Sequence, residues 1–146
     1  MPDKILAPAV RPCATCPYRL DAPSGLWHPS EYAKLSGYDQ ETPFQPFDVF
    51  LCHQVRDALC AGWCGVHDMG ENLAVRIAAA RHQFADRVVP ALYDYTTPVP
   101  LHPSGRAAAE HGLRDITEPS VQARKAARKL LRHRGDLQVL DPDAAP

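Results

Sequence analysis

The feature that most constrains this chain is the clustering of its cysteines. All five lie between residues 13 and 64 of a 146-residue sequence. Cys13 and Cys16 form a Cys-x-x-Cys pair, and the other three follow at Cys52, Cys60 and Cys64. An odd number of cysteines does not make a closed disulfide framework, and clustered thiols in a reducing compartment indicate metal ligands or redox groups. We therefore expect four of them to meet in space and hold a metal.

Composition predicts one small domain with many loops. The length fits the usual range of roughly 100–200 residues per domain. Hydrophobic residues make up 45% of the chain, whereas 15 prolines and 8 glycines predict short elements. No run of about 18 apolar residues exists to span a membrane, and the first residues lack the pattern of a signal peptide, so cytoplasmic localisation is expected. The net charge of −1 gives no overall attraction to nucleic acid.

Hydrophobic periodicity predicts a mostly α fold with extensive loops around a metal site of four cysteines, and leaves room for one short β-hairpin. The expected elements are helices over 27–35 (with Gly37 as the stop), 71–84, 104–111 and 117–133, a helical turn or two over 53–61, and a short strand over 47–51. We expect the rings of Phe44, Phe47 and Phe50 to pack on the core. Residues 88–93 form an apolar patch interrupted by Pro90.

Two parts of the domain differ in character. Residues 1–95 are interpreted as a cysteine-motif metal-binding core. Residues 96–146 are interpreted as a C-terminal helical extension packed on the same domain, with a basic helix and a frayed acidic tail over 136–146.

The Cys13-x-x-Cys16 turn supplies half of a tetrahedral zinc site, in which each Zn–S bond is about 2.3 Å long. The simplest source of the other two ligands is Cys52 and Cys60. The same four thiolates also suit a [4Fe–4S] cluster, which is the alternative cofactor.

Rival ligands exist in the same stretch. Cys64-x-x-His67 has the spacing of a second half-site, and His53 follows directly after Cys52. Neighbours on an extended chain point to opposite faces, which favours a place beside the site for His53 rather than on the metal. The alternative without metal treats cysteines as small buried hydrophobes, which explains Cys64 better than five cysteines together.

Three further residues are expected to surround the ligands, namely Arg19, Trp27 and Trp63. Arg19 has a simpler alternative, a surface salt bridge with Asp21. A thiol-disulfide enzyme is a weaker interpretation of the Cys-x-x-Cys pair. A redox-active pair of this kind opens a helix, and the prolines at positions 12 and 17 oppose one here.

The ordered motifs resemble a family of small cysteine-motif proteins of unknown function from actinobacteria and their phages. They are CxxCPYR, GLW, EYAKL, FLCHQ and CAGW, and they span roughly residues 11–80. The matching positions are Cys13, Cys16, Pro17, Arg19, Gly25, Trp27, Tyr32, Leu35, Cys52, His53, Cys60, Gly62 and Trp63. Cys64 lies outside the pattern, so the resemblance implies the ligand set Cys13, Cys16, Cys52 and Cys60. It implies no activity.

A second cluster is basic. Six of the 16 lysines and arginines lie within eleven positions, at Arg124, Lys125, Arg128, Lys129, Arg132 and Arg134. On a helix they form adjacent stripes, an arrangement that can contact nucleic acid or an acidic protein. The simpler alternative is a solvated helix face, and the acidic tail can also fold back on it.

These patterns favour a non-enzymatic, metal-stabilised module with a regulatory or interaction role. Its partner is expected to be a nucleic acid or an acidic protein, bound through Arg124, Lys125, Arg128, Lys129 and Arg132. An iron–sulfur redox sensor or electron-transfer protein is the first alternative, and a thiol-disulfide enzyme is the second. No small-molecule substrate and no membrane partner is indicated.

Overall fold

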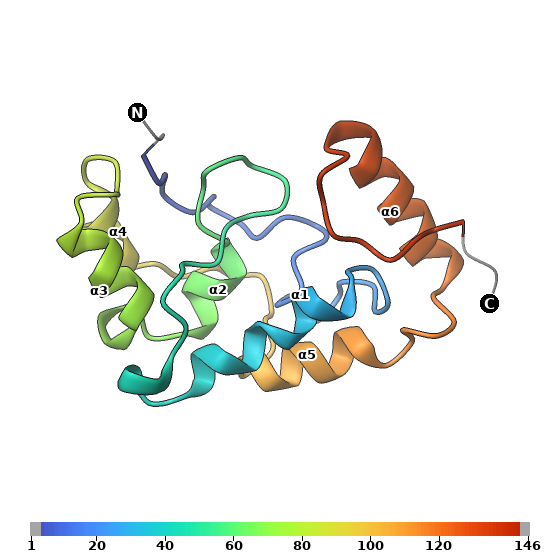
Figure 1. Cartoon of the computed structure of the whole chain (residues 1–146), viewed down its shortest axis with the longest axis horizontal. Helices are drawn as coiled ribbons and strands as arrows, with labels where there is room; N and C mark the ends of the chain where they lie inside the picture. The colour runs from blue at the N-terminus through green and yellow to red at the C-terminus, as the bar shows by residue number, and fades with distance from the viewer. Residues whose placement is uncertain (1–3, 144–146) are drawn as a thin grey trace.

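The computed structural model describes residues 4–143 and consists of short helices joined by long loops. The helical segments in that range are α1 (Pro29–Ala33), η1 (Leu35–Asp39), η2 (Thr42–Phe44), α2 (Ala61–Val66), η3 (Met69–Glu71), α3 (Leu73–Ala80), α4 (Val88–Tyr93), α5 (Gly105–Leu113) and α6 (Val121–His133). Helices α3 and α4 lie at one end of the long axis and α6 at the other, with α2 between them (Figure 1). The described residues contain only isolated β-bridges besides these helices, so the mostly α class is confirmed.

Capping side chains set the starts of the longer helices. Asn72, Ser104 and Ser120 each accept a hydrogen bond from the backbone N–H three residues ahead, at the first turns of α3, α5 and α6. Such caps satisfy donors that have no partner inside the helix. The predicted helices over 71–84 and 117–133 therefore exist but begin later than expected. The first also ends earlier, at Ala80, and His82 then takes a positive φ of 55°.

The segment before Gly62 differs from the prediction. No helix forms over 53–60, and α2 begins where the predicted turns were to end. Gly62 lies inside α2 rather than at a helix stop. Only a glycine fits there, because a Cβ would lie 2.4 Å from Sγ of Cys16. The glycine marks a close approach of two segments rather than a helix stop.

Three further local predictions need correction. Gly37 does not end the helical region, because η1 runs through it to Asp39. Residues 88–93 form α4, in which Pro90 falls in the first turn, where its missing N–H costs little. The predicted strand over 47–51 reduces to a single antiparallel bridge between Leu51 and Leu59, which gives the loop between them a hairpin-like form.

The core is built around large rings. Trp27, Trp63, Tyr18 and Tyr32 are fully buried. Phe50 is also buried, as predicted, but the other two phenylalanines that were expected to pack on the core are exposed. Phe44 is 73% exposed at the end of η2, and Phe47 is 70% exposed in the loop that follows.

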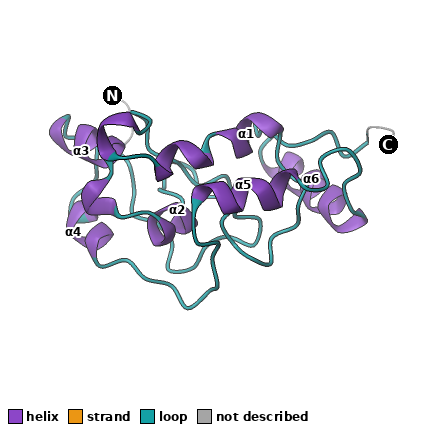
Figure 2. Cartoon of the chain, turned by 90° about the horizontal axis from the view of Figure 1, so that it is seen from below, coloured by secondary structure: helices purple, strands orange, loops and turns teal. Residues whose placement is uncertain are grey.

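Helices α1 and α5, with η1, form a helix layer in which α1 and α5 run side by side (Figure 2). Glycines allow this close packing. A Cβ on Gly112 would lie 2.0 Å from the ring of Tyr32, and one on Gly105 would lie 2.0 Å from the carbonyl oxygen of Leu35. The carboxylate of Asp39 accepts hydrogen bonds from the N–H groups of Gly105 and Arg106, both at 2.8 Å, and so caps α5.

The segment after α6 folds back along the molecule. Leu140 donates its N–H to the carbonyl of Leu26 at 2.9 Å, and Val139 forms an antiparallel bridge with Trp27. The expected fraying is therefore wrong for residues 136–143, whereas folding back onto the basic helix is observed. Residues 1–3 of the predicted core and 144–146 of the predicted tail lie outside the described residues, and the division at residue 95 stays a prediction.

Candidate functional site

The four cysteines predicted as ligands come from two loops that lie together. Cys13 and Cys16 lie on one tight turn, in which the N–H of Cys16 donates to the carbonyl of Cys13 at 2.9 Å. Cys52 and Cys60 lie on the two arms of the hairpin-like loop, and their N–H groups donate across it to Ala58 and Phe50. These four residues all line one cavity of about 180 Å³, which we name the thiol cavity.

The sulfurs are arranged as two pairs. Sγ of Cys16 lies 3.6 Å from Sγ of Cys60, and Cys13 pairs with Cys52. Each pair therefore joins the N-terminal turn to the hairpin-like loop.

Within each pair the electrostatics are unequal. The hydrogen bond from Cys13 lowers the pKa of Cys52 to about 5, and the same contact, with burial, raises the pKa of Cys13. The hydrogen bond from Cys60 lowers the pKa of Cys16, whereas burial raises the pKa of Cys60. Within each pair, therefore, the pKa of one sulfur is lowered and the pKa of its partner is raised.

Backbone N–H groups point at the accepting sulfurs. Those of Gln54 and Val55 lie 3.4 and 3.3 Å from Sγ of Cys52. Those of Tyr18 and Gly62 lower the pKa of Cys16. Hydrogen bonds to the charged form of a group favour that form, so both loops are shaped to stabilise negative sulfur.

The rival ligands lie differently. Cys64 does not line the thiol cavity, and burial raises its pKa to about 12. Nε2 of His67 is hydrogen-bonded to the hydroxyl of Tyr18 at 2.9 Å, and its Nδ1 lies 3.7 Å from Oδ1 of Asp39. His53 lines the thiol cavity, but its Nε2 lies 3.2 Å from Oε2 of Glu31.

Within residues 4–143, no group of three or more His, Cys, Asp and Glu side chains is placed so that it could hold a metal ion. The four cysteines converge on one cavity, and metal binding by them is a hypothesis.

The three residues expected around the ligands have clear contacts. Arg19 forms a bidentate salt bridge with Asp21, at 2.7 and 2.8 Å, and donates to the carbonyl of Pro12. Trp27 donates its indole N–H to the carbonyl of Thr15, which fixes the Cys-x-x-Cys turn. Trp63 is fully buried in α2, and its indole nitrogen has no hydrogen-bond partner in the described part of the protein.

The basic helix is α6, and its charges face different surroundings. Arg128 donates to Asp143 and to the carbonyl of Pro142, both at 3.1 Å, and Arg124 donates to the same carbonyl at 3.2 Å. The tail thus contacts both arginines, of which Arg128 stays exposed. Lys125, Lys129 and Arg132 are exposed.

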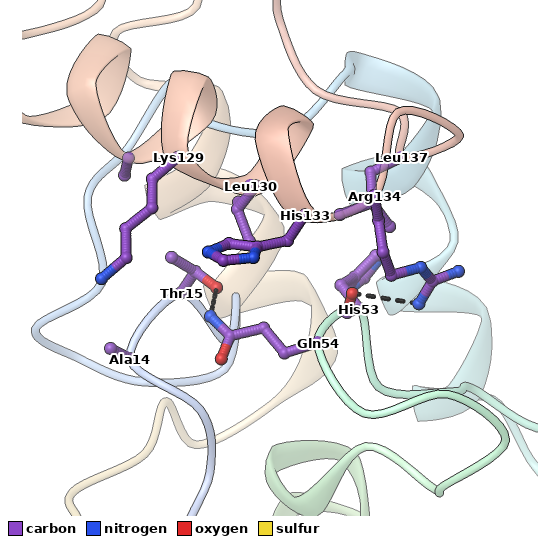
Figure 3. A pocket seen from close by; sticks show the side chains of 10 residues that line it. Ala14, Thr15, His53, Gln54, Lys129, Leu130, His133, Arg134 and Leu137 are labelled. Atoms are coloured by element: carbon purple, nitrogen blue, oxygen red, sulfur yellow. Dashed lines mark hydrogen bonds between the residues drawn. The ribbon is translucent and has the colours of Figure 1, made fainter.

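A second hollow lies between α6 and the two cysteine loops, and the sequence did not predict it. This α6 pocket has a volume of about 570 Å³. Its floor is closed by a hydrogen bond of 2.9 Å from the amide of Gln54 to the hydroxyl of Thr15 (Figure 3). Arg134 donates to the carbonyl of His53 at 3.1 Å and joins the end of α6 to the same loop. The only signal in the sequence was the basic cluster itself.

His53 has a structural role that the sequence did not reveal. Its ring stacks on Trp27 with ring centroids 4.0 Å apart. The hydrogen bond from His53 and the neighbouring Lys34 hold the pKa of Glu31 at about 2. The histidine that follows Cys52 therefore ties the hairpin-like loop to α1.

Comparison with known families places the chain. A family of unknown function, DUF6283, matches residues 8–128. The chain belongs to this family. The match spans both cysteine loops and most of α6, and it confirms the expected membership of a family without an assigned function. No curated protein and no solved structure matches the chain. No helix in the described range is long and apolar enough to cross a membrane.

Proposed function

We propose that this protein is a non-enzymatic metal-binding module in which Cys13, Cys16, Cys52 and Cys60 bind one Zn²⁺ ion as thiolates. The observation that carries the proposal is that these four thiols, from two loops distant in the sequence, line one small cavity. The ion supplies stability here, because structural zinc sites contribute their binding free energy to folding.

The donor set fits zinc. Four sulfur ligands at about 2.3 Å in a tetrahedron lie about 3.8 Å apart. The 3.6 Å between the sulfurs of Cys16 and Cys60 is close to that separation. In a [4Fe–4S] cluster each thiolate binds a different iron, which places the sulfurs further apart. These two sulfurs are thus close enough to share one ion, and the cluster stays the alternative.

The proposal also explains why the loops present N–H groups to sulfur. Four thiolates in one cavity need a cation to balance their charge. The donors from Gln54, Val55, Tyr18 and Gly62 support the charged form of Cys52 and Cys16. Such contacts orient and stabilise metal ligands in other proteins.

The role of the module is interaction or regulation. Its partner is a nucleic acid or an acidic protein, and Lys125, Lys129 and Arg132 on α6 are the exposed charges that support this choice. Arg124 and Arg128, predicted as part of the same surface, both donate to the carbonyl of Pro142, so a partner would compete with the tail for these two side chains.

Metal analysis of anaerobically purified protein tests the proposal. We expect about one zinc per chain, a colourless solution, and loss of the zinc in Cys16→Ser and Cys52→Ser. Cys64→Ala is the matched control, because Cys64 is buried one turn beyond Cys60 but does not line the thiol cavity, and it should keep the zinc.

Two results contradict the zinc proposal. A brown protein with absorbance near 400 nm identifies an iron–sulfur cluster instead. A colourless protein without metal, whose thiols cycle with a disulfide reductant, identifies a thiol enzyme.

A further inference from the structure

The α6 pocket has the size and construction of a small-molecule site. Its volume of about 570 Å³ lies within the range of roughly 300–1,000 Å³ that is typical of ligand pockets. Its walls come from three segments far apart in the sequence: Ala14–Thr15, His53–Gln54 and the second half of α6 with Leu137. A hydrogen bond from Gln54 to Thr15 joins the first two segments. Another, from Arg134 to the carbonyl of His53, joins the end of α6 to the second segment.

The lining combines positive charge with an apolar wall. Lys129 and His133, one helical turn apart, lie on the pocket side of α6 together with Leu130 (Figure 3). Ala14, Ala126 and Leu137 complete the apolar part, and none of the residues that line the pocket is acidic. The guanidinium of Arg134 forms part of the wall but is bound to Asp136 and to His53, which leaves the lysine as the cation available to a ligand.

We propose that the α6 pocket binds a small phosphomonoester that carries an apolar group. The ammonium of Lys129 provides a point charge for the phosphate, and the imidazole of His133 provides a second donor one turn away. Thr15 and Gln54 offer neutral hydrogen-bonding groups on the opposite side. Leu130 and Leu137 contact the apolar part of the ligand.

This site is distinct from the thiol cavity. The residue common to both linings is His53, and no cysteine lines the α6 pocket. The ligand therefore contacts the outer side of the loops that carry the cysteines and does not touch sulfur. The proposal goes beyond metal binding, and its readouts do not depend on which metal the thiols hold.

Calorimetric titration of the full-length protein with phenyl phosphate, at physiological ionic strength, tests the proposal. We expect saturable binding that is tighter than that of inorganic phosphate or of phenol, because only the first probe fills both parts of the pocket. Lys129→Ala should weaken binding at least about tenfold, as expected for the loss of one charge-assisted hydrogen bond.

Lys125→Ala is the matched control. It removes the same charge one turn earlier on α6, where the side chain is exposed and does not line the pocket, and binding should not change. Amide NMR signals of Thr15, Gln54 and His133 should shift on titration in the wild type. Both lysines are exposed, so neither variant should alter the fold.

Three results overturn the proposal. One is the absence of binding at millimolar phenyl phosphate. Another is equal weakening by Lys125→Ala and Lys129→Ala, which shows diffuse attraction to a basic helix. The last is affinity for phenyl phosphate no greater than for inorganic phosphate.

Discussion

The helix layer and the thiol cavity are held together by different kinds of contact. In the helix layer, the ring of Tyr32 packs against the backbone at Gly112, and Asp39 caps α5. These contacts need no group from outside the chain. Around the thiol cavity the backbone is irregular, and the two cysteine loops meet through two pairs of sulfurs.

This difference indicates where the stability of each region comes from. Close packing between α1, η1 and α5 stabilises the helix layer, and this packing does not depend on the state of the thiols or on a metal. The cysteine loops depend on the state of their thiols, and thus on any metal that binds them. His67 joins the two regions, because it contacts Tyr18 next to the thiol cavity and faces Asp39 in the helix layer.

The largest effect is expected from Gly112→Ala. The new Cβ would lie 2.0 Å from the ring of Tyr32, and a buried tyrosine cannot move aside without disturbing the core. We expect a loss of about 3 kcal/mol or more in the free energy of unfolding, well above the roughly 1 kcal/mol that alanine gains over glycine in a helix. Urea unfolding monitored by circular dichroism measures this loss.

Gly135→Ala is the control for this substitution. Its Cβ would meet only the carbonyl oxygen of Leu131, at 4.0 Å, so its stability should stay close to that of the wild type. A chelator should not change the loss caused by Gly112→Ala, because that contact lies in the helix layer. Similar stability of the two variants would contradict the packing described for α1 and α5.

A middle-sized effect is expected from acid, through the residue that joins the two regions. Burial lowers the pKa of His67 to about 4, below its value of about 6.5 in an unfolded chain. Its contribution is therefore fully present above pH 6.5 and is lost as the pH falls toward 4. The loss reaches up to about 3 kcal/mol.

His67→Gln separates this effect from other acid-sensitive groups, because glutamine does not titrate in this range. The free energy of unfolding of the wild type should fall more steeply between pH 6.5 and pH 4 than that of the variant. Parallel curves would show that His67 is not buried as the neutral imidazole. The carboxylate of Glu31, whose pKa is about 2 against 4.5 in an unfolded chain, loses its contribution mainly below pH 4.5, so it overlaps this window only at the acid end and does so equally in both proteins.

The smallest effect is expected where the tail meets α6. Arg128→Ala removes exposed contacts with Asp143 and the carbonyl of Pro142, and such surface pairs contribute at most about 1 kcal/mol. Thermal unfolding should change little. Hydrogen exchange of the amide of Leu140 should become faster if the arginine holds the tail in place, and an unchanged rate would show that the bridge between Val139 and Trp27 is enough.

Local sequence rules predicted the parts of the fold that depend on neighbouring residues. Helices were expected over 27–35, 104–111 and 117–133, and α1, α5 and α6 form within or close to those ranges. The same rules misjudged Gly62, because the reason for a glycine there is the sulfur of Cys16, 46 positions earlier. Helix-breaking residues have two interpretations, and only the partner in space decides between them.

The candidate site, like the fold, was predictable from the sequence only in part. Cysteine spacing correctly brought two distant loops together, because thiols of this number and grouping have few other uses. It did not reveal the pairing of Cys16 with Cys60, the contact between His53 and Glu31, or the α6 pocket. These depend on how the loops pack, which no short motif records.

Three β-bridges join residues near the N-terminus to residues much later in the chain, and these bridges affect how the protein folds during synthesis. Leu6 pairs with Ala58, Ile5 pairs with Phe84, and Trp27 pairs with Val139. Chains are made from the N-terminus onward, so the bridges of Ile5 and Leu6 can form only after Phe84 and Ala58 have emerged from the ribosome. Trp27 is made more than a hundred residues before Val139, so their backbone bridge can form only late in synthesis.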